Sequence, residues 1–130
     1  MRTVLVLLLT IFSIMESYSQ NKPTDRMPVA AGRFYESDKT SLEKDIASLF
    51  LECKKVPADK VVRAIISPHA GYVFSGRIAA SAFSATPQNA SYKNIFIIGS
   101  SHVMAFDGAS VYSIGDFVTP LGKTKVNKEI

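Results

Sequence analysis

Cysteine and histidine are scarce in this 130-residue sequence, which has one cysteine and two histidines. The single cysteine, Cys53, cannot form a disulfide within the chain, so a disulfide framework is excluded. Stability therefore has to come from the packing of apolar side chains. The length allows one small domain and no more.

Long apolar runs are also lacking. The longest one, over residues 4–15, is too short to span a bilayer as an ordinary helix. It follows a basic residue, Arg2, and precedes small residues at 17 and 19, which is the pattern of a signal peptide. We therefore predict that residues 1–19 are removed by cleavage after Ser19. The mature protein is expected to be exported, periplasmic or extracellular, without a stable membrane anchor.

The net charge of +4 is spread along the chain, and no basic stripe alternates with aromatic residues. A nucleic-acid-binding surface typically gathers its basic residues on one face. The dispersed lysines therefore indicate a solvated surface and no nucleic-acid partner.

Two common catalytic patterns are absent as well. Residues 71–78 copy the glycine spacing of a phosphate-binding loop, but Arg77 and Ile78 replace the lysine and hydroxyl that such a loop requires. Neither Ser75 nor Ser101 lies in the Gly-x-Ser-x-Gly setting of a serine hydrolase. A weaker alternative stays open, in which Arg77 and the start of the adjoining helix bind a small anionic group or an acidic peptide.

Two helices are predicted after a polar, flexible lead-in over 20–27. The first begins at a capping box formed by Thr40 and Glu43 and ends before Pro57. Its apolar residues fall on one helical face: Leu42, Ile46, Leu49, Phe50 and Cys53. The second has Ser75 as its cap and ends at Pro87, and its expected inward face consists of Ile78, Ala79, Ala82 and Phe83.

Apolar runs on either side of the second helix, "VVRAII" over 61–66 and "IFII" over 95–98, predict strands buried on both faces. Strand, helix and strand together form a βαβ unit with parallel strands. A third strand over 108–113, a hairpin over 116–127 and a helix beginning at 127 are also expected. The predicted fold class is therefore α/β, a mostly parallel sheet with flanking helices. Because one helical turn cannot hold itself, the chain is expected to be truncated.

Both histidines lie just after these predicted strands, His69 three residues after the first and His102 four residues after the second. Neighbouring parallel strands lie about 4.8 Å apart, which allows two imidazoles to reach one ion at bonds of about 2.1 Å. The carboxyl edge of such a sheet is also where ligands bind. The pair therefore predicts part of a metal site for zinc, iron, copper or nickel. Asp107 is more typical of an Asp-Gly turn, and Cys53 of a core residue.

Four motifs resemble, in order and spacing, the amino-terminal half of the Memo-like family, also called AmmeMemoRadiSam system protein B. They are "PVAAGRFYESD", "SPHAGYVFSG", "IIGSSHVMAFDGASV" and "TPLGKTKVN". The resemblance covers residues 28–130. It implies one α/β domain similar to the class III extradiol dioxygenases, with non-haem iron or copper at the strand ends.

The resemblance also implies roles for single residues. His69 and His102 correspond to two metal ligands, and Tyr72 and Ser101 line the pocket. Arg77 is expected to line it too, but on the separate ground of its charge at the start of the adjoining helix. The remaining ligands, among them a cysteine, belong to the other half of the family sequence. Redox or oxygenase-like chemistry and a link to a radical SAM protein follow from the same resemblance. A non-enzymatic module for an anionic group or peptide is the alternative. Phe74 stands where a second tyrosine is common in the family.

Overall fold

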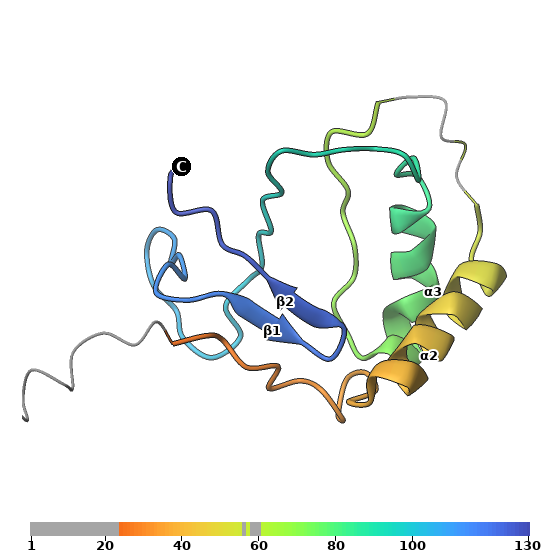
Figure 1. Cartoon of the computed structure of the whole chain (residues 1–130), viewed down its shortest axis with the longest axis horizontal. Coiled ribbons are helices and arrows are strands. Elements are labelled where there is room, and N and C mark those ends of the chain that lie inside the picture. Colours follow the sequence, from red (N-terminus) through yellow and green to blue (C-terminus); the bar gives the residue numbers. More distant parts are fainter. Residues whose placement is uncertain (1–23, 56, 58–60) are drawn as a thin grey trace, which may run out of the picture.

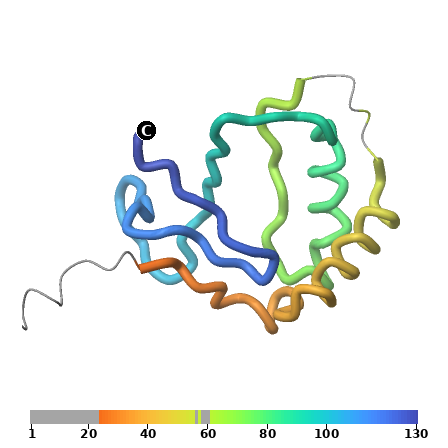
Figure 2. Tube along the Cα trace, in the orientation of Figure 1, coloured from red at the N-terminus to blue at the C-terminus, as the bar shows by residue number. Residues whose placement is uncertain are grey.

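The computed structural model describes residues 24–55, 57 and 61–130 of the chain. In this part the elements are helix α2 (Lys39–Glu52), helix α3 (Tyr72–Phe83), strand β1 (Phe117–Thr119) and strand β2 (Gly122–Thr124). The two helices lie against each other at one side of the molecule, and the hairpin lies apart from them (Figure 1). Long segments without regular structure join these elements, as the chain trace shows (Figure 2).

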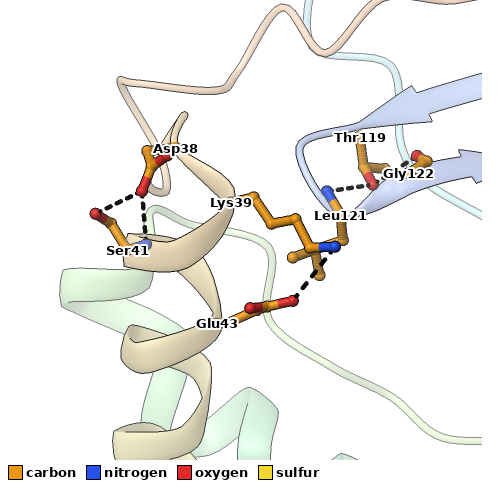
Figure 3. A network of polar contacts seen from close by, with 7 residues as sticks. All are labelled: Asp38, Lys39, Ser41, Glu43, Thr119, Leu121 and Gly122. Atoms are coloured by element: carbon orange, nitrogen blue, oxygen red, sulfur yellow. Dashed lines mark hydrogen bonds and ion pairs between the residues drawn. The ribbon is translucent and has the colours of Figure 1, made fainter.

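Helix α2 is close to its prediction, with a different cap. Asp38 caps it: the Asp38 carboxylate accepts hydrogen bonds from the Ser41 backbone N–H at 2.8 Å and from the Ser41 hydroxyl at 3.0 Å (Figure 3). These bonds hold the pKa of Asp38 below its ordinary value of 3.8. The predicted box of Thr40 and Glu43 is wrong, because the Glu43 side chain instead lies 3.8 Å from Lys39 Nζ.

Helix α3 also forms, but its cap and inward face differ from the prediction. Gly71 is the cap residue, and no side chain bonds there. Ser75 lies inside the helix and is buried. Ile78 and Phe83, expected to face inward, are 64% and 51% exposed. The face that packs carries small residues instead, which lets the two helices approach closely.

The two helices meet at Gly76 of α3 and Leu49 of α2. A Cβ atom added at Gly76 would lie only 2.7 Å from Leu49 Cδ1, which is too close for a real contact. Around this point, Leu42, Cys53 and Ala80 are the buried apolar residues of the described structure. The inward face predicted for α2 is therefore confirmed at Leu42 and Cys53.

Strands β1 and β2 confirm the predicted hairpin. They pair antiparallel, with Phe117 opposite Thr124 and Thr119 opposite Gly122. The Thr119 hydroxyl closes the turn, because it donates to the Gly122 carbonyl at 2.9 Å and accepts from the Leu121 N–H at 3.2 Å (Figure 3).

The segment before Pro28 docks onto this hairpin. Arg26 donates its backbone N–H to the Asp116 carbonyl at 2.7 Å and accepts the N–H of Val118 at 2.9 Å, which makes a parallel bridge to β1. The Asp25 carboxylate accepts the Asp116 N–H at 3.0 Å and lies 2.6 Å from Lys123 Nζ. The first described residues are thus joined to the hairpin near the end of the chain.

The predicted strands over 61–66 and 95–98 do not form in the structure. Neither segment belongs to a sheet of the described residues, and Ile66 and Ile98 are 96% and 95% exposed. A strand needs a neighbour for its backbone groups and a covering layer for its side chains, and the described part of the chain supplies neither. The third strand over 108–113 and the helix from 127 are likewise absent from the structure.

No helix within residues 24–55, 57 and 61–130 is both long enough and apolar enough to cross a membrane. The predicted signal peptide, residues 1–19, lies outside the described residues.

The contact between Gly76 and Leu49 predicts a specific sensitivity to side-chain volume. We expect Gly76→Val to lower the free energy of unfolding by about 1–3 kcal/mol, because the new side chain overlaps Leu49. Adding Leu49→Ala should recover part of this loss. Gly99→Val is the control, since a Cβ there would meet no atom within 4 Å. Equal losses in the two glycine variants, measured by chemical denaturation, would contradict the close contact.

The ion pair of Asp25 and Lys123 predicts that the stability of the fold falls at low pH. The hydrogen bond from Lys123 lowers the pKa of Asp25 below its ordinary value of 3.8, and the Asp116 N–H adds to this. Its stabilising effect is therefore present above pH 3.8 and is lost as the pH falls through the lowered value. Unfolding curves of the wild type and Asp25→Asn should converge in that range. Asp107→Asn, at an exposed loop position, is the matched control. A difference in the free energy of unfolding between the wild type and Asp25→Asn that persists at low pH would contradict the prediction.

Candidate metal centre

The structure brings the two histidines together. The Nε2 atoms of His69 and His102 lie 3.0 Å apart, and their rings meet edge to face with centroids 5.1 Å apart. Both residues are exposed, so the pair is open to solvent. The two residues are 33 positions apart in the sequence, and the sequence argument for their proximity assumed a sheet that the structure does not form.

The loop that carries His69 is held by hydrogen bonds to its backbone from two directions along the chain, the Phe34 turn and helix α3. The Tyr72 N–H donates to the Phe34 carbonyl at 2.8 Å. Gly71 lies over the same residue, where an added Cβ would be 3.5 Å from the Phe34 oxygen. From the other side, the buried Ser75 hydroxyl donates to the Ala70 carbonyl at 2.8 Å. The turn around Phe34 and the first turn of α3 therefore fix the chain directly after His69.

The loop that carries His102 is closed by its neighbour. The Ser101 hydroxyl donates to the Met104 carbonyl at 2.6 Å and accepts the Met104 N–H at 3.2 Å. His102 lies between these two residues. Ser101 was predicted to line a pocket, and in the structure its oxygen is engaged with the backbone of this turn.

Tyr72 and Arg77 each contact α2 or the segment before it. The ring of Tyr72 lies against the ring of Tyr35, with centroids 5.6 Å apart. Burial raises the pKa of Tyr72 above its ordinary value of 10.0, and Tyr35 and the Asp45 carboxylate raise it further. The Nε of Arg77 lies 3.7 Å from a carboxylate oxygen of Glu52, so the arginine predicted for the pocket has an acidic partner on α2.

The separation of the two Nε2 atoms fits two ligands on one ion. Two bonds of about 2.1 Å from one ion place their nitrogens about 3.0 Å apart when the angle between them is close to a right angle. The observed 3.0 Å matches this value. The same distance fits a hydrogen bond in which one ring donates and the other accepts, so the metal-free pair is also satisfied.

The described residues hold no group of three or more His, Cys, Asp or Glu side chains placed to bind an ion together. Cys53 is buried at the end of α2, where its Sγ lies 3.4 Å from the Phe50 carbonyl oxygen, as its prediction as a core residue requires. Asp107 lies in an exposed loop. Within the part of the chain that the structure covers, no third metal-binding side chain of these types accompanies the two imidazoles.

Sequence reasoning missed two groups that hold this site, the Phe34 carbonyl and the Ser75 hydroxyl. The first is a main-chain atom and leaves no mark in the sequence. Ser75 was predicted to cap the helix, but the helix begins one turn earlier at Gly71. Glycine is itself one of the residues found at this position, so Gly71 is the signal that could have corrected the prediction.

The chain belongs to the Memo-like family. The family profile described as "Memo-like protein" matches residues 26–130, which include both histidine motifs and the docked hairpin. This confirms the resemblance drawn from the four motifs.

Three relatives illustrate the similarity. A MEMO1 family protein of Pyrococcus abyssi is 34% identical over 105 residues, which are 81% of this chain and 36% of that protein. A MEMO1 family protein of Sulfolobus acidocaldarius is 35% identical over 115 residues, 81% of this chain and 40% of its own length. The "Protein memo-1 homolog" of Caenorhabditis elegans is 34% identical over 104 residues, 77% and 29% of the two chains. No solved structure matches the chain.

The chain therefore spans about two fifths or less of the length of the curated relatives it matches. What the described residues present is a part of the family's sequence that carries two helices, one hairpin and the histidine pair.

Tyr72 gives a titration that reports on this region. Because its pKa is raised, we expect the tyrosine absorbance change to include a high-pH part whose midpoint lies above pH 10.0, and Tyr72→Phe to remove that part. Stability should fall as the pH rises from 10.0 toward the folded value, because the unfolded tyrosine loses its proton first. Tyr92→Phe, at an exposed position, should leave the high-pH part in place. An unchanged high-pH titration in Tyr72→Phe would refute the burial of this phenol.

Proposed function

We propose that His69 and His102 supply two ligands of a metal centre that holds non-haem iron or copper. The approach of their Nε2 atoms to 3.0 Å supports this most directly. Neutral imidazole is a common ligand of both metals, and an exposed pair leaves room for further ligands and a substrate. When bound, such an ion would supply Lewis-acid or redox chemistry. His69 and His102 would bind the ion and fix its position.

The remaining ligands belong to the same proposal. In the family, as the resemblance implies, a cysteine and further acidic or histidine groups come from the sequence beyond the region matched here. Cys53 is not that cysteine, because it is buried at the carboxyl end of α2. Two protein ligands alone make an incomplete site for either metal.

The finer fold is part of the proposal as well. We infer that the segments 61–66 and 95–98 become parallel strands of an α/β sheet similar to that of the class III extradiol dioxygenases. Both segments run in the same direction on one side of α3 in Figure 1, as a βαβ unit requires. Their exposed branched side chains are those of strands that are covered on both faces.

Activity, partners and location rest on the family resemblance and on the sequence. Oxygenase-like or redox chemistry on a small-molecule or peptide ligand, a functional link to a radical SAM protein, and export after cleavage near Ser19 are proposed on this basis. The alternative module for an anionic group would use Arg77 as a donor. That role is less well supported, because Arg77 lies beside Glu52.

Removing either histidine tests the proposal. We expect His69→Ala and His102→Ala each to weaken copper(II) or iron(II) binding to the full-length chain by about a hundredfold or more. Removing a residue that only hydrogen-bonds to a metal ligand costs about 10–100-fold in affinity, and removing the ligand itself should cost more. Calorimetric titration measures this. Glu43→Gln, on the exposed surface of α2, is the control and should bind the metal as the wild type does. Equal metal affinity in both histidine variants and the control would defeat the proposal.

A chelator separates the proposal from the alternative. A module that binds an anionic group through protein donors alone should keep binding inorganic phosphate after chelation. If phosphate binding survives chelation and also survives both histidine substitutions, the site lies elsewhere and the metal centre is not its basis.

A further inference from the structure

Two serine hydroxyls bond to the backbone of the loops that carry the histidines. Ser75 reaches the loop after His69, and Ser101 closes the turn around His102. The carbonyls that accept these two hydroxyls, those of Ala70 and Met104, lie outside the helices and strands. We infer that Ser75 and Ser101 are positioning residues, which set where the two imidazoles stand relative to each other. This inference rests on the proposed function for its importance, but its geometry does not depend on a metal.

Ser75 makes a bond that is unusual for a serine in a helix. A helical serine commonly donates to the carbonyl four residues earlier. Ser75 lies 3.5 Å from that oxygen, on Gly71, and only 2.8 Å from the carbonyl oxygen of Ala70. Its bond thus leaves the helix and grips the residue that directly follows His69. The side chain is buried, so water cannot easily replace the bond.

Ser101 acts within a smaller unit. Its hydroxyl both donates to and accepts from the backbone of Met104, which closes a four-residue turn with His102 as its second member. Because Ser101 is exposed, water competes for these hydrogen bonds. The conformation of the turn therefore depends on the two bonds to Met104 and not on burial. Loss of the hydroxyl frees the backbone that carries the imidazole.

The precision that the pair needs explains why such contacts matter. Metal ligands must be held within about 0.5 Å of their working positions, and loops achieve this less well than helices or strands. Both histidines lie on loops in the structure. On the His69 side, the Phe34 carbonyl fixes the loop from outside and Ser75 fixes it from the helix.

The test uses three serine-to-alanine variants of the full-length chain. Ser75→Ala and Ser101→Ala remove the positioning bonds. Ser81→Ala is the matched control, because the Ser81 hydroxyl donates to the Arg77 carbonyl at 2.9 Å on the same helix, away from either histidine loop. Two measurements are made on each: the through-space NMR contact between the two histidine rings without metal, and copper(II) affinity by calorimetry.

We expect Ser75→Ala and Ser101→Ala to weaken the ring contact and to lower copper(II) affinity about tenfold, the lower end of the cost of losing a support of a metal ligand. Ser81→Ala should change neither. Ser101→Thr keeps the hydroxyl and should restore both readouts, which a general loss of folding would not allow. If Ser75→Ala unfolds in a thermal melt, the pair Ser101→Ala and Ser101→Thr decides alone.

The two readouts separate this inference from the proposed function. If the ring contact follows the serines while copper(II) binds none of the proteins, the positioning role stands and the metal centre fails. If the ring contact and the copper(II) affinity of Ser75→Ala and Ser101→Ala equal those of Ser81→Ala, the positioning role is overturned.

Discussion

The hydrogen bond from the Tyr72 N–H to the Phe34 carbonyl is the contact on which the rest of the described structure depends. It joins the turn that leads into α2, the loop that carries His69 and the first residue of α3. Because Tyr72 begins α3 and Phe34 lies just before α2, this one bond sets how the two helices start relative to each other. Gly71 lies directly against Phe34 at this point, since a Cβ atom added to it would be 3.5 Å from the Phe34 oxygen. The small helix core and the histidine loop therefore share one anchor.

The second constraint is apolar surface that has no cover among the described residues. The segments 61–66 and 95–98 expose branched side chains that in water cost free energy, and their backbones have no strand partners. At the other end of the structure, backbone hydrogen bonds of Arg26 and the ion pair of Asp25 hold the first described residues against the hairpin. The backbone groups at the hairpin end thus have partners within the described residues, whereas the segments 61–66 and 95–98 have no strand partners there. This contrast supports the proposed α/β fold for the longer proteins of the family.

Sequence patterns predicted elements that are stabilised locally and missed those that depend on distant partners. The apolar spacing of α2 and the Pro-x-Gly turn of the hairpin are local, and both appear in the structure. The strands over 61–66 and 95–98 were read correctly as apolar, but a strand exists only when another strand pairs with it. The cap of α2 shifted from Thr40 to Asp38 because both residues can accept the free N–H groups, and only the backbone geometry chooses between them. For the site, the proximity of the two histidines was predicted, although the parallel strands on which that prediction relied do not form in the described residues. The support from Ser75 could not be predicted, because its bond reaches past the carbonyl that helical spacing favours.

The central claim is that His69 and His102 bind one ion together. X-ray absorption at the copper edge of the copper(II)-loaded full-length chain tests this most directly, because imidazole rings give a distinct scattering pattern. The account predicts two histidine nitrogens at about 2.0–2.1 Å from the metal, and one fewer in either His69→Ala or His102→Ala. A copper spectrum with oxygen ligands alone, unchanged by either substitution, would contradict it.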